Sequence, residues 1–267
     1  MGFLAYFKRP KITRLSLKDW QRNRDVFTKT YRVNFIPPVL EPLLYLFALG
    51  FGLGSLVGTV TIFHLNISYT RFIAPALVSI SIMNSAFFEC TYGSFVRMHY
   101  QKTFDAMIAT PLSLEDVIAG ELMWGATRSL INGTIILLVV SAFGLVDFSF
   151  ALLILPVSFI GGFLFAALGM IFTAISPNID TLNYPTFLLI TPMLLFSGTF
   201  FPLSVLPKAL QILALAALPL ANLVSLNQGL TLKSLGWLQL YNLAWILIVS
   251  IVLAVVAINL MRKRLIE

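Results

Sequence analysis

The segment RMHYQKTFDAMIATPLSLEDVIAGE, residues 97–121, decides how this chain folds, because it sets a charged, half-amphipathic insert between two long apolar runs. Apolar runs of this length place a chain in a lipid bilayer as helices. The polar insert must then leave the bilayer and return to it, as a surface that a soluble partner can contact. The chain is therefore predicted to cross the membrane at least twice.

The composition of the whole chain agrees with a membrane location. Of its 267 residues, 58% are hydrophobic and 11% are charged, and the mean hydropathy is +0.91. A soluble domain carries roughly 25% charged residues. We therefore expect an all-α membrane protein that crosses the bilayer several times. Its single cysteine, Cys90, excludes a disulfide within the chain.

Six apolar runs are each long enough to cross the hydrocarbon core as a helix, which takes about 20 residues. They cover residues 35–58, 71–96, 117–144, 151–175, 182–203 and 238–261. A further apolar stretch, 205–226, is broken by Pro207, Lys208 and Pro219. We expect this stretch to form a re-entrant or external helical hairpin after the fifth span.

Lysine and arginine residues fix the orientation of these spans. With six crossings, three basic clusters share one side: nine residues before the first span, two in the 97–116 loop and three after the last span. The positive-inside rule makes this side cytoplasmic, together with both termini. The domains are then a cytoplasmic N-terminus, 1–33, a transmembrane domain, 34–262, and a cytoplasmic tail, 263–267. The net charge of +7 thus reflects topology and lipid headgroup contact rather than nucleic-acid binding.

Residues 16–33 are predicted to form a helix that lies in the membrane surface. Ser16 and Asp19 resemble a capping box at its start. Leu17 shares one face with four residues, and basic residues fill the other face, as in interfacial helices. The four are Trp20, Arg24, Phe27 and Tyr31. This interfacial helix is either a membrane anchor only or a cuff that also contacts a cytoplasmic partner.

The loop of 97–116 contains a second short amphipathic helix, predicted over 98–108. Pro111 stops this helix, and Ser113 then caps the next one, which has acidic residues in its first turn. The segment is either an ordinary connecting loop or a docking helix for a partner. The candidate contact residues are Tyr100, Gln101, Lys102, Phe104 and Asp105.

Two ionisable residues fall inside predicted spans. Glu89 and Arg128 lie roughly 12 Å and 16 Å from the cytoplasmic ends of antiparallel neighbours, at 1.5 Å per residue, so they can pair. Buried charges are costly and usually face a bundle interior, so the pair is either structural or part of a translocation route. Glu121 is closer to the cytoplasmic end and is expected to reach water. The two histidines, His64 and His99, are predicted on opposite sides of the membrane and cannot share a metal.

The run PMLLFSGTFFPLSVLP, 192–207, is unusually broken for a spanning segment, because prolines punctuate it and a Ser-Gly-Thr sequence interrupts it. Broken backbone at membrane depth is tolerated only where protein or a water-lined cavity satisfies it. The run is either a proline-kinked helix end or the start of an outer hairpin. In the preceding span, small residues are expected to permit close helix packing. They are Gly161, Gly162, Ala166, Ala167 and Gly169.

Motifs of catalysis are missing from the sequence. It contains no G-x-x-x-x-G-K-[ST], so the chain is not expected to hydrolyse ATP through a P-loop. It also offers no candidate triad and no Cys/His metal spacing. We therefore expect a membrane protein that is not an enzyme and has no cofactor of its own.

Three blocks of sequence carry a resemblance to a known family. They are EPLLYLFALGFGLGS (41–55), NSAFFECTYGSFVRMHYQKTFDAMIATPLSLEDVIAGELMWGATRS (84–129) and FSGTFFPLSVLP (196–207). The chain resembles the ABC-2 type permeases of ATP-binding-cassette exporters from about residue 16 to residue 262, with the closest likeness to the NodJ subgroup. The third block is similar to the hallmark of that family at its fifth span.

The resemblance implies a half-permease of a bacterial inner membrane. A homodimer of this chain and two P-loop ATPase subunits would form one exporter, and ATP and Mg²⁺ would be bound by the ATPase. Residues 97–109 resemble the coupling helix and 16–31 the connecting helix, while the hairpin after span five resembles an outer gate. The gate candidates are Phe196, Ser197, Gly198, Phe200, Phe201 and Pro202.

The resemblance also implies a class of substrate. NodJ-like permeases are implicated in the export of lipo-chitooligosaccharides, and relatives in the wider family export polysaccharides, lipids and drugs. We therefore expect a lipid-linked saccharide or another amphipathic compound.

The main alternative is a channel or secondary carrier that works without an ATPase. Secondary carriers usually show inverted repeats with discontinuous helices in both halves, whereas this chain is broken only near its fifth span. A second alternative is an import or immunity subunit of the same family, which would use the same machinery for other cargo.

Overall fold

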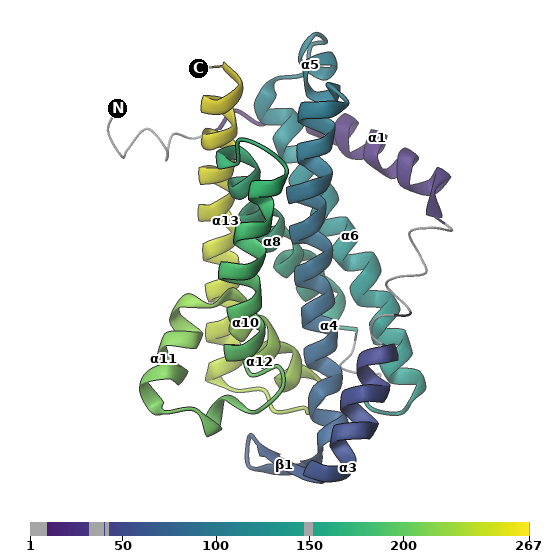
Figure 1. The fold of residues 1–267 in the computed structure, drawn as a ribbon, viewed down its shortest axis with the longest axis vertical. Coiled ribbons are helices and arrows are strands. Elements are labelled where there is room, and N and C mark those ends of the chain that lie inside the picture. Colours follow the sequence, from purple (N-terminus) through teal and green to yellow (C-terminus); the bar gives the residue numbers. More distant parts are fainter. Residues whose placement is uncertain (1–9, 32–39, 41–42, 147–151, 267) are drawn as a thin grey trace.

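Four long apolar helices form the bundle in the computed structural model, which describes residues 10–31, 40, 43–146 and 152–266 (Figure 1). By length and composition, each of the four could cross a membrane. The first is α4 with its continuation through the π-helical turns η3 and η4, and the others are α6, α8 and α13. Their bounds are Tyr69–Phe88, Glu89–Gly93, Val96–Tyr100, Leu114–Ala142, Ile154–Ile175 and Trp237–Ile266. The chain is thus a multi-pass helical membrane protein, and four of the six predicted spans coincide with these helices.

The predicted first and fifth spans fall on shorter helices. Within 35–58 the structure describes an apolar helix, Leu43–Val57, formed by η2 and α3. Within 182–203 it has three short helical pieces that end at Phe196. The bounds are Leu46–Leu53 for η2, Gly54–Val57 for α3, Asp180–Leu182 for η5, Asn183–Pro185 for α9, Thr186–Ile190 for η6 and Thr191–Phe196 for α10. The count of six crossings stays a prediction.

The predicted hairpin after the fifth span corresponds to two helices joined by a sharp bend. After the 3-10 turn η7 (Leu203–Val205), α11 (Lys208–Ala217) meets α12 (Pro219–Thr231) at 98°. Pro219 starts the second helix because its fixed backbone angle and missing N–H suit a first turn. Every residue of α12 is buried, whereas α11 lies largely exposed at the surface.

A short β-hairpin precedes α4 in this otherwise helical chain. Strands β1 (Thr59–Ile62) and β2 (Leu65–Ser68) pair antiparallel, and the turn holds Phe63 and His64 at positive φ. The sequence analysis had assigned these residues to no element. The hairpin lies at the end of the molecule opposite α5 (Figure 1).

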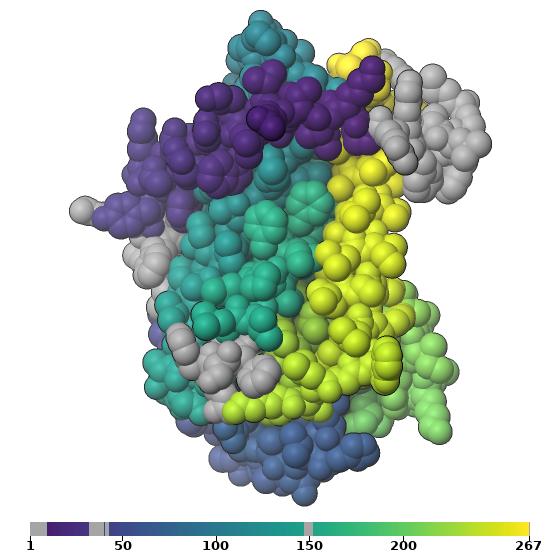
Figure 2. All heavy atoms as spheres, turned by 180° about the vertical axis from the view of Figure 1, so that it is seen from behind, coloured from purple at the N-terminus to yellow at the C-terminus, as the bar shows by residue number. Residues whose placement is uncertain are grey.

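Helix α1 (Ser16–Lys29) crosses the bundle obliquely and packs on α6 (Figures 1 and 2). The predicted capping box at its start is wrong. Leu15 occupies the cap position without a side-chain bond, and the Ser16 hydroxyl donates to the Thr13 carbonyl at 2.9 Å. Asp19 is instead buried against α6.

The separate helix in the polar insert after α4 is shorter than predicted. The first helix continues to Tyr100, and Lys102 then adopts a left-handed conformation with φ of 53°. Only α5, Thr103–Ile108, forms the separate surface helix that was predicted over 98–108. Ser113 caps α6 in a full capping box with Asp116, which confirms the predicted start of that helix.

Small residues set the distance between α8 and its neighbours, as predicted. A Cβ on Gly162 would lie 2.5 Å from Ser129 Cβ on α6, and one on Gly169 would lie 2.7 Å from the Phe87 carbonyl oxygen on α4. Both are closer than packed atoms allow, so the helices approach each other through these glycines. In a bilayer, close van der Waals contact of this kind replaces the hydrophobic effect between helices.

Candidate functional site

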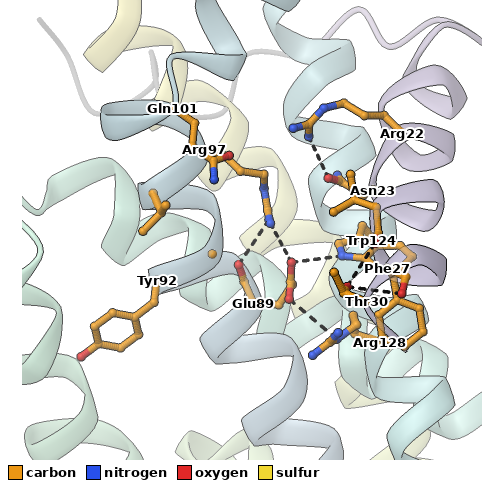
Figure 3. Close-up of a pocket in the computed structure, with 13 residues that line it drawn as sticks. Arg22, Asn23, Phe27, Thr30, Glu89, Tyr92, Arg97, Gln101, Trp124 and Arg128 are labelled. Carbon is orange, nitrogen blue, oxygen red and sulfur yellow. Dashed lines mark hydrogen bonds and ion pairs between the residues drawn. The ribbon is translucent and has the colours of Figure 1, made fainter. Parts of the chain in front are cut away.

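A charged cavity of 440 Å³ lies where α1 crosses the ends of α4 and α6 (Figure 3). Val26 and Gln101 are exposed at its rim, while Glu89, Arg97 and Arg128 are less than one-fifth exposed. The lining residues are Arg22, Asn23, Val26, Phe27, Thr30, Glu89, Tyr92, Gly93, Val96, Arg97, Gln101, Trp124 and Arg128. The cavity therefore combines a charged floor with an apolar wall.

Arg97 holds this floor together by pairing with two carboxylates. Its Nη1 donates to Glu89 Oε1 at 2.9 Å, and its Nε and Nη2 donate to the two oxygens of Glu121 at 2.9 and 2.5 Å. Glu121 is fully buried and also accepts bonds from Ser94 Oγ at 2.5 Å and Asn23 Nδ2 at 3.0 Å. The expectation that Glu121 reaches water is therefore wrong, because a buried carboxylate needs such partners.

Glu89 and Arg128 come together as predicted, at the edge of this network. The Arg128 Nε lies 3.7 Å from Glu89 Oε2, and the guanidinium lies over the Phe27 ring, 4.9 Å from its centroid. Glu89 also accepts a bond from Trp124 Nε1 at 3.1 Å, so α4 and α6 are joined at a second level. In Figure 3, Glu89 lies between Arg97 and Arg128, and Arg22 and Asn23 face the cavity from α1.

Helix α1 contributes a polar buried face that hydropathy did not reveal. Asp19 is 1% exposed, and its Oδ1 has no hydrogen-bond partner in the structure. Its neighbour on α6 is Gly120, where a Cβ would lie 2.5 Å from Asp19 Oδ2. Burial and the nearby Glu121 carboxylate raise the pKa of Asp19 to about 8, against weaker lowering by Arg97 and Arg22. Asp19 is thus largely protonated at neutral pH.

The four predicted interfacial residues divide into two pairs. Trp20 donates its indole N–H to Thr127 Oγ1 at 2.9 Å, and Phe27 packs edge-on against Trp124, with ring centroids 5.6 Å apart. Both therefore attach α1 to α6. The other two are exposed: Arg24 pairs with Asp25 at 2.7 Å and lies over the Trp20 ring, and Tyr31 is half exposed.

The five predicted contact residues near α5 share one end of the molecule (Figure 1). Tyr100 is 60% exposed, and Gln101, Lys102 and Asp105 are also exposed, with Lys102 Nζ 4.0 Å from Asp105 Oδ2. Phe104 is fully buried in the core. It therefore anchors the helix instead of offering a contact surface.

Of the six predicted gate residues, Phe196 ends α10 and the other five lie in the turn that follows it, near the opposite end. Phe196 is 44% exposed, Gly198 has a φ of 73°, and Ser197 and Pro202 are buried. The broken backbone is satisfied by protein. Tyr69 Oη donates to the Phe200 carbonyl at 3.0 Å, and Gln228 Nε2 donates to the Gly198 carbonyl at 3.4 Å. Phe201 is half-buried in the same turn.

Arg97 and Glu121 form the centre of this network, and sequence reasoning missed their pairing although a signal for it exists. Glu89 and Arg128 face each other because they are nearly equidistant from residue 109, at the tip of the α4–α6 hairpin. Arg97 and Glu121 are equally symmetric about that point. The register that predicted the first pair therefore also predicts the second.

Comparison with known proteins gives a consistent result. The family model described as ABC-2 type transporter matches residues 19–226. Nodulation protein J of Sinorhizobium fredii is 35% identical over 248 residues, which cover 93% of each chain, and that of Rhizobium leguminosarum bv. viciae is 40% identical over 207 residues, 78% of each chain. The inner membrane transport permease YadH of Escherichia coli is 28% identical over 196 residues, 72% of this chain and 73% of that one. No solved structure matches the chain.

Replacing Arg97 with Met should lower the free energy of unfolding by about 3–5 kcal/mol, because it leaves the buried Glu121 carboxylate without its cation. Adding Glu121→Gln should restore much of the loss, since the amide keeps the bonding partners Ser94 and Asn23. Denaturant unfolding in detergent measures both values. The exposed Arg24→Met serves as the control, with an expected loss below about 1 kcal/mol. An Arg97→Met chain as stable as this control would contradict the assigned role.

The docking of α1 on α6 should weaken as pH rises from about 4 to 8. Over this range the docked state keeps the Asp19 proton that the detached state has lost. Each pH unit therefore reduces the free energy that favours docking by at most about 1.4 kcal/mol. Above pH 8 both states are deprotonated and the dependence ends. Spin labels on exposed positions of α1 and α6 report the docked fraction. Asp19→Asn should remove the dependence, whereas the exposed Asp25→Asn should retain it.

Proposed function

The chain belongs to the ABC-2 type transporter family, and we propose that it is the transmembrane permease subunit of an ATP-binding-cassette exporter. Two copies of the chain would form a homodimer that works with two copies of a P-loop ATPase subunit. ATP and Mg²⁺ would be bound by that subunit. The permease would then supply the route and the ATPase the energy.

The observation that carries the proposal is the structure of the polar insert. An exposed tip of Tyr100, Gln101, Lys102 and Asp105 stands at the end of the α4–α6 hairpin, and Phe104 anchors it in the core. A push on such a tip is transmitted to both helices because Arg97, on the α4 continuation, pairs with Glu121 on α6. We propose that the ATPase contacts this tip when it binds ATP, with α1 as a second contact.

The proposed orientation places this end in the cytoplasm of a bacterium whose inner membrane holds the protein. The arrangement of basic residues supports it, since α1, α5 and the C-terminal end of α13 lie together (Figure 1). Arg262 Nη1 lies 3.3 Å from Glu115 Oε1, which ties the end of α13 to the start of α6. Six crossings would bring both termini to this side, with Leu43–Val57 and the α9–α10 segment in spans one and five. YadH is named as an inner membrane permease, which agrees with this location.

The proposed route runs between the two copies, along spans one, two and five. Large apolar side chains are exposed on the helices assigned to spans one and five, including Phe47 and Phe187. We place the outer gate at residues 196–202 with the α11–α12 bend. The substrate would be a lipid-linked saccharide or another amphipathic compound, in keeping with the likeness to proteins named nodulation protein J.

Charge reversal at the tip tests the coupling. Lys102→Glu or Asp105→Lys should lower transport-coupled ATPase activity about five-fold or more, because a coupling free energy is typically 1–3 kcal/mol. Insertion into the membrane should be unchanged, since both side chains are exposed. The measurement is the ATPase rate of the complex purified from native membranes by affinity capture of this chain.

The matched control is Lys208→Glu, an exposed lysine at the start of α11, which should leave the rate unchanged. Normal coupling in both tip variants would remove the tip as the contact site. Recovery of the chain without any ATPase in mild detergent would instead favour a channel or secondary carrier.

Replacing Phe196, Phe200 and Phe201 together with alanine should alter transport at the outer end. The loss of three aromatic rings widens the turn, while the backbone bonds from Tyr69 and Gln228 remain. Substrate flux into vesicles and the coupled ATPase rate measure the effect. Unchanged flux would remove these residues from the gate. Phe159→Ala, an exposed aromatic on α8 outside the proposed route, serves as the control.

A further inference from the structure

A second cavity lies at the end of the molecule opposite α5, where the β-hairpin meets α11, α12 and the start of α13 (Figure 1). Its volume of 370 Å³ is in the range of ligand-binding pockets, about 300–1,000 Å³. Among the described residues, no aspartate, glutamate, lysine or arginine lines it. Its polar lining consists of hydroxyl, amide and imidazole groups, from Thr61, His64, Ser204, Gln211, Ser225 and Gln228.

Helix α12 presents two buried polar side chains to this cavity. Ser225 and Gln228 are three residues apart, so they share one face of the helix, and they are 5% and 4% exposed. In the described part of the chain the Ser225 hydroxyl has no hydrogen-bond partner, and the Gln228 side chain bonds only through Nε2, which donates to the Gly198 carbonyl. Neither the hydroxyl nor Gln228 Oε1 is enclosed by protein. Both oxygens are therefore available to a ligand.

Helix α11 adds a third such group from another side. Gln211 donates its Nε2 to the Leu206 carbonyl at 2.7 Å and to the Ser204 carbonyl at 3.4 Å, which holds the side chain beside η7. Its Oε1 is left over, and an amide oxygen can only accept. Because α11 and α12 meet at 98°, the free oxygens come from two walls of one cavity.

The rest of the lining is apolar and includes an aromatic side chain. Leu203, Leu215 and Leu238 contribute aliphatic surface, and Phe63 contributes its ring from the turn of the β-hairpin. Phe63 has a φ of 49°, a conformation that bulky side chains rarely adopt. Strained backbone of this kind persists only where the surrounding structure holds it, and it is found most often at functional sites.

This combination of groups selects the chemistry of a ligand. An ion would lose its hydration without meeting an opposite charge, which is costly. A hydrocarbon chain would leave the oxygens of Ser225 and Gln228 buried without hydrogen bonds, which also costs free energy. A ligand that fits must donate several hydrogen bonds, carry no charge and have an apolar face. The hydroxyl groups and C–H faces of a sugar ring meet all three conditions.

We propose that this cavity binds an uncharged sugar ring, whose hydroxyl groups donate to Ser225, Gln228 and Gln211. The cavity adjoins the candidate outer gate, because Pro202 lines it and Gln228 bonds to Gly198. A molecule that leaves through the gate would meet the cavity, so the ring would be the head of the exported substrate. That last step rests on the proposed function, whereas binding of the sugar does not.

The test is equilibrium dialysis of labelled methyl glucoside against the purified full-length chain in lipid nanodiscs, where no detergent with a sugar head competes. Methyl glucuronide is the same ring with a carboxylate, and cyclohexanol is a ring of the same size with one hydroxyl. We expect only methyl glucoside to bind. Equal binding of cyclohexanol would overturn the role of the hydroxyl groups, equal binding of methyl glucuronide would overturn the selection against charge, and no binding of methyl glucoside would overturn the site.

Substitution of Ser225 assigns the site to this cavity. Ser225→Ala should weaken binding of methyl glucoside about five-fold, the effect of losing one hydrogen bond, and should leave the unfolding temperature unchanged because the hydroxyl bonds to no described protein group. Thr231→Val is the matched control, since Thr231 is a buried hydroxyl on the same helix that does not line the cavity. Unchanged binding in Ser225→Ala, or an equal loss in Thr231→Val, would overturn the proposal.

Transport then tests whether the sugar belongs to the exported molecule. In the complex with its ATPase, Ser225→Ala should lower substrate flux while the ATPase still co-purifies. Weakened sugar binding with unchanged flux would overturn the assignment of the ring to the substrate. Sugar binding by a chain that recruits no ATPase would instead overturn the proposed function and leave the sugar site in place.

Discussion

The pairing of Arg97 with Glu89 and the buried Glu121 is the interaction on which the arrangement of α1, α4 and α6 depends. In a bilayer, helices gain little from the hydrophobic effect between them, so close packing and polar contacts must hold them. Glycines on α8 supply the first. The Arg97 network supplies the second, since Arg97 and Glu89 lie on the α4 continuation, Glu121 lies on α6, and Asn23 of α1 donates to Glu121. Glu121 is accommodated in this buried position because three side chains donate hydrogen bonds to it.

Those parts of the fold that follow from local rules could be predicted from sequence. Hydropathy located α4, α6, α8 and α13, because about 20 apolar residues in a row have few other stable placements. Ser113 and Asp116 marked the start of α6, since a capping box involves only neighbours in sequence. The Glu89–Arg128 pair followed from the register of one helical hairpin.

The features that sequence analysis missed depend on contacts between distant segments. Ser16 and Asp19 have the spacing of a capping box. Gly120 on α6 leaves room for Asp19, however, so Asp19 packs against α6 and the capping box does not form. The packing of α1 on α6 also explains why the buried face of α1 is polar. Hydropathy predicted that a neighbouring, more apolar face would be the buried one. The β-hairpin of 59–68 was missed because its two strands have only four residues each and fall in the short stretch between the predicted first and second spans.

The same network constrains how the protein could move. Phe104 of α5 is fully buried, and Arg97 on the α4 continuation pairs with Glu121 on α6. A force on the tip therefore moves α4 and α6 together instead of bending the loop. The weaker contacts lie between α1 and α6, where Asp19 has an unbonded oxygen and Arg128 an unbonded nitrogen. Relative movement at this end should therefore occur first between α1 and the α4–α6 pair.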